Sequence, residues 1–447
     1  MGPAPRGPAS HRAARPPTAN ARTPAREAHA KTMTATAAAT RRNVIGLLWH
    51  GTFLAGASAL VAPTTILPAY VAGLGGSPAL IGLAITILLT GDVLPQLVFA
   101  RVVEGSPSKR PFLLIAVYSR AAAWLVLGLA TWLLQRSSTG ILLGLLVLLL
   151  AAFATGGSLG DVAYTDVYGK SIPPGIRGRF YATRQFIGSL VGVGTAAIAR
   201  LVLASGIAPL AGSYALLFTG SGILMLVAGI GFVMIREEPG RAQPRPPLRA
   251  FLRQLRAMWR EDRSLRALVL IENLASMHLM ILPFYAVMAI EVLHVPTSTV
   301  AVFAMVQVIG GALSNLLWGR LNDRVGSGAV LRACLALGSL MPLLALLLAA
   351  VAPAAYGLVF LFLGAATNSR SLAFNNVLVD RAPTELRATY TGMVGTLTAP
   401  TLLLPLLGGT LIGLLGFQAV FLGVAAALAV TWAGLGRTHV LFAPPRG

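Results

Sequence analysis

The sequence predicts an all-α integral membrane protein whose twelve transmembrane helices form two pseudo-symmetric six-helix bundles. Three observations predict this class. Hydrophobic residues make up 56% of the 447 residues and charged residues only 11%, and the mean hydropathy of +0.76 exceeds that of soluble domains. The apolar residues form runs of about 20, the length of helix that crosses a bilayer. Arginine and lysine gather in alternate connections between these runs.

The expected spans follow one another with short connections, except for one longer loop in the middle of the chain. They cover residues 44–71, 77–100, 111–134, 139–168, 181–205, 209–235, 266–292, 298–319, 328–351, 355–379, 388–413 and 416–435. The long loop divides them into six and six. The chain is therefore divided into these parts: a basic tail at 1–42, a first bundle at 43–235, a linker at 236–265, a second bundle at 266–436 and a tail at 437–447.

The net charge of +21 is distributed as the topology of a membrane protein requires. Nucleic-acid binding would place the basic residues on one surface, whereas here they alternate along the chain. By the positive-inside rule the basic connections and both termini face the cytoplasm. We expect a multi-pass, monomeric protein of the cytoplasmic membrane, with the lipid bilayer as its partner and no nucleic acid.

The tail and the linker carry the rest of the positive charge. Residues 1–42 are rich in Ala, Pro, Arg and Thr without apolar periodicity, which is typical of a disordered segment. Five apolar residues of the linker recur at helical spacing opposite four arginines: Leu248, Phe251, Leu252, Leu255 and Trp259. This pattern predicts an amphipathic helix on the anionic membrane surface. A plain tether and a protein-binding site are the alternatives.

The two halves of the sequence repeat each other. A shift of 219 residues aligns 97–101 with 316–320 and Glu104 with Asp323, and a shift of 210 aligns 163–167 with 373–377. The second shift also aligns Arg177 with Arg387. Two matches at similar offsets predict a duplication, so that parallel repeats of six helices are related by an axis along the membrane normal.

A charged tight turn is expected between the eighth and ninth spans. Its pattern Gly-x-Leu-x-Asp-Arg-x-Gly is formed by Gly319, Leu321, Asp323, Arg324 and Gly326. The pattern resembles motif A of the major facilitator superfamily, and helix count, the six-loop-six division and the repeat extend the resemblance over residues 44–436. The fifth span departs from the drug antiporters of that family, because its glycine-rich run at 188–194 lacks proline.

The resemblance implies a secondary transporter that moves a small organic solute by alternating access. It also implies that helices one, four, seven and ten line a central cavity. In this chain those helices carry the candidate substrate or proton-coupling residues: His50, Asp161, Tyr164, Glu272, Asn273, Asn368 and Arg370. Ionisable groups inside spans are costly, which makes each a functional hypothesis.

Several roles are open for these groups. Asp161 lies on a polar face of its helix with Tyr164 and can accept a proton. Arg370 lies about 15 Å deep, where it either binds an anionic group of the substrate or neutralises Asp161 or Glu272. His50 and Glu272 lie at similar depth, so they can form a proton relay or be hydrogen-bonded core residues.

Asp92 and Arg120 are expected to pair between the second and third helices. Each lies about 13 Å inside the cytoplasmic boundary by the rise of a helix. A structural ion pair and a coupling site are both open, and removal of one partner would leave a buried charge.

The connections at the cytoplasmic side carry the predicted gate. Its residues are Gly319, Asp323, Arg324 and Gly326 in the second half, Glu104 as the reduced copy in the first half, and the matched pair Arg177 and Arg387. Their contacts would form in one conformation and break in the other. The repeat predicts that Asp323 and Arg324 are the stronger latch. Topology alone is the alternative role of the charges.

No catalytic or nucleotide-binding motif occurs in the sequence. Gly169-Lys170-Ser171 lacks the earlier glycine of a P-loop, and there is no His-Glu-x-x-His motif or Cys/His cluster. No enzyme activity, metal or cofactor is therefore expected, and a proton or other ion gradient would supply the energy. An uncoupled facilitator and a drug or lipid exporter of the same fold are the alternatives.

Overall fold

The computed structural model describes residue 2 and residues 23–134, 138–237, 248–381 and 387–435, and its regular elements there are all helices. Ten segments of this part are long and apolar enough to cross a membrane. One of them, Tyr390–Leu435, holds two spans because Gly416 adopts a φ of 81° and bends the chain. Helix α14 (Gly357–Arg381), which carries Arg370, is one more span. The predicted twelve-helix fold is confirmed.

The first half contains six spans, two of which are broken. In chain order its helices are α1 (Thr23–Leu60), α2 (Ile66–Gly73), α3 (Pro78–Val93), α4 (Gln96–Glu104), α5 (Arg110–Leu134), α6 (Thr139–Ser171), the short 3₁₀ helix η2 (Pro174–Ile176), α7 (Arg177–Ala204) and α8 (Leu210–Met234). The breaks contain Pro63 and Pro95, because proline cannot donate to the helix ladder and clashes with the preceding turn. Proline thus interrupts the first and second spans.

The second half follows the linker helix α9 (Leu248–Glu261). Its elements are α10 (Arg263–Ala275), η3 (Ser276–Met280), α11 (Phe284–Glu291), α12 (Thr297–Val325), α13 (Ser327–Val351), η4 (Pro353–Ala355), α14, α15 (Arg387–Thr398), η6 (Ala399–Leu403) and α16 (Leu404–Leu435). The seventh span is broken next to Pro283, so the first span of each half has the same interrupted form. Helix α9 covers the segment for which an amphipathic helix was expected.

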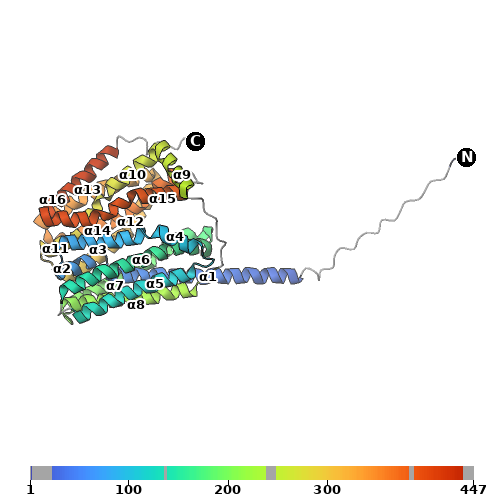
Figure 1. Ribbon diagram of the computed structural model, residues 1–447, viewed down its shortest axis with the longest axis horizontal. Helices are drawn as coiled ribbons and strands as arrows, with labels where there is room; N and C mark the ends of the chain where they lie inside the picture. Colours follow the sequence, from blue (N-terminus) through green and yellow to red (C-terminus); the bar gives the residue numbers. More distant parts are fainter. Residues whose placement is uncertain (1, 3–22, 135–137, 238–247, 382–386, 436–447) are drawn as a thin grey trace.

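Two groups of helices lie side by side along one direction (Figure 1). In the first half α1 packs on α7 and α8, α5 on α6 and α8, and α3 on α6; in the second half α12 packs on α14, and α13 on α14 and α16. The halves meet where α3 contacts α16 and where α7 contacts α12.

The two ends of the bundle differ in charge. Helices α4 and α9 lie at one end and α2 and α11 at the other (Figure 1). We call the first the basic end, since Lys109, Lys170 and Arg324 lie there, and the second the distal end. At the distal end the halves touch backbone to backbone, because Gly82 lies against Pro405, and Gly409 lies against Pro78.

Two boundaries differ from the prediction. Helix α1 begins at Thr23, so part of the tail that was expected to be disordered is helical and projects from the bundle (Figure 1). The alanine-rich sequence of 23–42 explains this, because alanine has the highest helix propensity and Pro24 suits a first helical turn. The second difference concerns the predicted charged turn at 319–326. Helix α12 continues through it to Val325, and the turn itself is Gly326 with a φ of 98°.

Candidate functional site

A cavity of about 530 Å³ lies between the two halves. Helices α1 and α7 of the first half and α12 and α14 of the second half line it. Its polar lining residues are Ser58, Thr64, Tyr181, Arg184, Gln185, Ser189, Gln307, Thr367 and Asn368. This volume and this mixture of apolar walls with a few polar groups are typical of small-molecule sites.

The cavity is closed on one side and open on the other. Thr64 donates a 3.0 Å hydrogen bond from Oγ1 to Oε1 of Gln307, which links the halves at the deep wall. Nearer the basic end the lining residue Tyr181 is 61% exposed, and Gln185 is exposed as well. Access therefore runs from the basic end toward the Thr64–Gln307 contact.

Arg184 in α7 is a functional candidate that the sequence analysis missed. It lies near the start of the expected fifth span, where a basic residue is an ordinary boundary signal. A helical face would have identified it, because Tyr181, Arg184, Gln185 and Ser189 recur at i, i+3, i+4 and i+8. Gly51 of α1 makes room for its side chain, since an added Cβ there would lie 2.9 Å from both Cγ and Cδ of Arg184.

Behind Arg184 lies a smaller pocket of about 230 Å³ within the first half, lined by His50, Arg120, Asp161, Tyr164 and Arg184 among others. The ring of His50 stacks on Phe232 at 3.8 Å between centroids, and its Nδ1 lies 3.3 Å from the carbonyl oxygen of Ala228. His50 thus has the surroundings of a core histidine. Glu272, its proposed relay partner, lies in the other half.

The interior charges of the first half alternate in sign. Arg120 shares one pocket with Asp92 and another with Asp161, and it faces the charges of both. Asp161 faces Arg120 and Arg184. In the described part of the chain none of these four groups forms a direct ion pair with another. The predicted partners Asp92 and Arg120 are brought together, but Arg120 is shared between two acids.

The second half has a direct interior ion pair. A guanidinium nitrogen of Arg370 lies 3.9 Å from a carboxylate oxygen of Glu272 and donates a 2.6 Å hydrogen bond to the hydroxyl of Ser276. Its guanidinium also lies 5.4 Å from the ring centre of Phe374. Of the two roles left open for Arg370, the geometry matches internal pairing with Glu272.

The two asparagines of the second half have different surroundings. Asn273 donates hydrogen bonds to the carbonyl oxygens of Val269 and Leu397, at 2.8 and 3.3 Å. Asn368 lines the central cavity and donates to the carbonyl oxygen of Gly311 at 2.8 Å. Asn368 is thus the one member of the predicted set among the described lining residues of that cavity.

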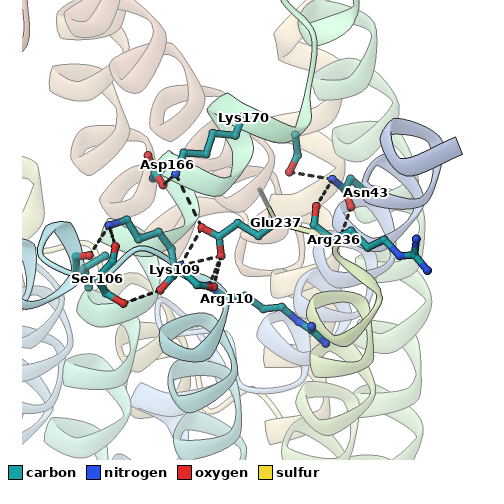
Figure 2. Close-up of polar contacts among 11 residues, drawn as sticks. Asn43, Ser106, Lys109, Arg110, Asp166, Lys170, Arg236 and Glu237 are labelled. Carbon is teal, nitrogen blue, oxygen red and sulfur yellow. Dashed lines mark hydrogen bonds and ion pairs between the residues drawn. The ribbon is translucent and has the colours of Figure 1, made fainter. Parts of the chain in front are cut away.

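A polar cluster joins four segments at the basic end of the first half (Figure 2). Glu237, just after α8, accepts hydrogen bonds from the hydroxyl of Ser108 at 2.8 Å and from the backbone N–H groups of Lys109 and Arg110 at 2.7 Å each. Its charge stabilises the start of α5, where the helix dipole is positive. Lys170 of α6 lies 3.9 Å away.

The same cluster extends to α1 and α6. The amide of Asn43 accepts a 2.8 Å hydrogen bond from the backbone of Arg236, and Lys170 pairs with Asp166 at 2.5 Å (Figure 2). The sequence analysis placed Glu237 in the linker and gave it no role. The signal available in the sequence was a carboxylate placed directly after the end of a span.

The predicted gate residues are largely unengaged in this conformation. Asp323 and Arg324 are exposed at the end of α12, with no hydrogen-bond or ion-pair partner in the part of the chain that is described. Arg177 donates to the carbonyl oxygens of Ile172 and Gly169, at 3.0 and 2.8 Å, instead of to a carboxylate. It therefore caps the end of α6.

The remaining predicted gate residues are two glycines and two residues whose side chains the structure does not describe. An added Cβ at Gly319 or Gly326 would meet no atom within 4 Å, but Gly326 needs its positive φ to join α12 to α13. The side chains of Glu104 and Arg387 lie outside the described residues. The relative strength of the Asp323–Arg324 latch stays a prediction.

Residues 48–400 match the family model of the Major Facilitator Superfamily. The chain belongs to this family. It is a multi-pass membrane transporter, as the family and the apolar helices together show. No curated protein matches the chain.

Solved transporters share the fold over nearly the whole chain. A mutant of the nucleoside transporter NupG is 16% identical with a TM-score of 0.66, covering 90% of this chain and 100% of its own. A bacterial homologue of the iron transporter ferroportin, in an inward-facing state, is 14% identical with a TM-score of 0.67, covering 88% and 98%. A D-xylose–proton symporter is 16% identical with a TM-score of 0.60, covering 88% and 96%. At these identities the likeness shows the fold alone.

Proposed function

We propose that this transporter carries a small organic solute across the cytoplasmic membrane by alternating access, with its basic end in the cytoplasm. The observation that carries the proposal is the central cavity, which both halves line and which the Thr64–Gln307 contact closes on the distal side. The glycine contacts at the distal end let the backbones of the halves approach closely, and rigid-body rocking can break such contacts without rebuilding a core. The basic end faces the cytoplasm by its charge.

The proposal assigns proton coupling to Asp161. This carboxylate lies in the pocket beside the central cavity and faces Arg120 and Arg184 without a direct ion pair to either in the described ranges. Protonation would therefore change the charge next to the cavity wall. Glu272 is a weaker candidate for the same role, because Arg370 already compensates its charge.

Gly409→Ala tests the rocking motion. An added Cβ at Gly409 would lie against the backbone of Pro78 and 3.0 Å from Phe284, so it opposes closure of the distal end. Overpacking costs about 1–3 kcal/mol, and 1 kcal/mol changes a conformational ratio about fivefold. In a Cys334→Ser background, which removes the single cysteine, alkylation of Gln185→Cys from the basic side should slow about fivefold.

Gly413→Ala is the matched control on the same helix. An added Cβ at Gly413 meets no atom within 4 Å, so this variant should label like the parent. Equal labelling of the Gly409→Ala and Gly413→Ala proteins would contradict a rocking motion that closes at this contact. Faster labelling of Gly409→Ala from the distal side would support it.

A further inference from the structure

We infer that the substrate is a small organic anion whose carboxylate or phosphate group binds Arg184. This inference rests on the proposed transport function and names the substrate class for the central cavity. Among the described residues that line the cavity, Arg184 is the one charged side chain, and there is no carboxylate. A cavity with low-dielectric walls and a single positive charge attracts anions and repels cations.

The hydrogen-bond donors of Arg184 have no acceptor within the described ranges. Its guanidinium lies 5.5 Å from the ring centre of Tyr164, and Gly51 lets the side chain lie against α1. Both contacts orient the group, which lines the central cavity as well as the smaller pocket behind it. An arginine inside a membrane normally pairs with a carboxylate or with backbone carbonyls, so this one lacks the partner that a bound oxyanion would supply.

The other interior arginines show the contrast. Arg370 lies against Glu272 and Ser276. Arg120 faces two acids, Asp92 and Asp161, and its guanidinium lies 4.2 Å from the ring centre of Phe153. Asp161 faces Arg120 as well as Arg184, so it is not committed to the cavity arginine. Arg184 lies in the wall of the cavity of about 530 Å³ without an acid beside it there, whereas Arg120 lines a smaller space between the halves together with Asp92.

The donor geometry and the neighbours define the ligand further. A guanidinium presents a planar fork of N–H groups that matches the two oxygens of a carboxylate or phosphate. The amides of Gln185, Gln307 and Asn368 and the hydroxyls of Ser58 and Ser189 line the same space. These groups suit the hydroxyl and carbonyl groups of an organic acid or a phosphate ester. The cavity of about 530 Å³ admits a molecule of that size.

The test is thermal stabilisation of the purified full chain, because a ligand that binds only the folded state stabilises it by RT ln(1 + [L]/Kd). The probes are succinate and gluconate for carboxylates, inorganic phosphate and glucose 6-phosphate for phosphates, glucose as a neutral solute and choline as a cation. At least one anion should raise the Tm, and glucose and choline should not. The arms also distinguish a carboxylate from a phosphate substrate.

Arg184→Gln should raise the Kd of the stabilising anion about 10- to 150-fold, the range expected for the loss of a hydrogen bond to a charged group. Arg184→Lys keeps the charge without the fork and should bind with intermediate strength. Gly51→Ala displaces the guanidinium without removing it and should also weaken binding. Arg200→Gln is the matched control, since Arg200 is an exposed arginine of the same helix, and it should bind like the parent. Size-exclusion chromatography checks that each variant is folded.

Three outcomes would overturn the inference. These are stabilisation of the parent by glucose or choline but by no anion, stabilisation by none of the probes, and equal anion binding by the Arg184→Gln and Arg200→Gln proteins. None of these decides the transport function. That function is tested separately by the Gly409→Ala labelling, which needs no ligand, so the two failures are distinguishable.

Discussion

The two halves descend from one repeated pattern but use their interior charges in different ways. In the second half Arg370 is held by Glu272 and Ser276. In the first half Arg184 lies in the cavity wall, and Asp161 faces two arginines without a direct pair to either in the described ranges. A charge with an internal partner stabilises a bundle, whereas a charge with an incomplete set of partners is available to a proton or a ligand. This difference favours the first half as the place of the proposed proton coupling and anion binding.

At the basic end the first half has the charge with partners, and the second half has the exposed charges. Glu237 connects the end of α8 to the start of α5 and lies near α6 (Figure 2). Asp323 and Arg324 of the second half are exposed there. The first half is therefore held together at the basic end by Glu237, whereas the second half is held by neutral donors, since Tyr390 donates to Asp262 at 2.6 Å and Asn376 to Asn322 at 2.9 Å. Rigid-body rocking requires each half to be held together by contacts of its own.

The largest expected effect is that of Asp161→Asn on proton-driven uptake. If the coupling group lies in the first half, proton-driven uptake of the stabilising solute should fall about 5- to 150-fold, the usual range of a coupling free energy, while solute exchange at equal pH persists. Uptake into proteoliposomes with and without a proton gradient measures both. Asp166→Asn, five residues along the same helix, is the control and should keep its coupling. A proton flux that ignores neutralisation of Asp161 and Glu272 together would remove proton coupling from the proposal.

The next effect concerns stability. Arg370→Gln leaves the carboxylate of Glu272, which is 18% exposed, without its ion-pair partner, and should lower the free energy of unfolding by about 3 kcal/mol. The double variant Arg370→Gln, Glu272→Gln should recover most of this loss, because no uncompensated charge remains. Thermal unfolding of the single and double variants measures the difference. An Arg184→Gln protein that loses as much stability as Arg370→Gln would erase the contrast between the halves.

The smallest effects lie at the basic end. Glu237→Gln removes a charge that caps α5, and the loss of such a cap costs about 1–2 kcal/mol. Faster backbone hydrogen exchange at residues 108–113 should report it. Asp323→Asn, an exposed acid without a described partner, should change stability by no more than about 0.5 kcal/mol. A larger effect for Asp323 than for Glu237 would show that the sequence-based gate, and not the Glu237 cluster, holds the basic end in this conformation.

Much of the fold was predictable because its causes are local. The length of an apolar run specifies a span, Pro63 and Pro283 specify the broken first helix of each half, and Gly326 specifies a turn that needs a positive φ. The start of α1 was misplaced because a charged, alanine-rich segment has both a disordered composition and a high helix propensity. Composition and helix propensity are both local signals, and here they predict opposite structures with equal strength.

The candidate site was less predictable. Asn368 was expected at the cavity and lies there, whereas Arg184 was overlooked and Asn273 bonds to backbone carbonyls. Depth along a helix follows from counting residues, but the direction in which a side chain points around the helix depends on which neighbours pack against it. Counting residues left Arg370 with two possible acids, Asp161 and Glu272, and gave Arg184 no partner.

By itself the sequence determined that this chain crosses a membrane twelve times, that its halves repeat and that its basic connections share one end, because hydropathy and charge act on each segment separately. Only the tertiary structure decided which charges meet. It paired Arg370 with Glu272, gave Glu237 to the start of α5 and left Arg184 in the cavity wall. The physical reason is that an ion pair depends on distances of a few ångströms between helices far apart in the chain, and packing sets those distances.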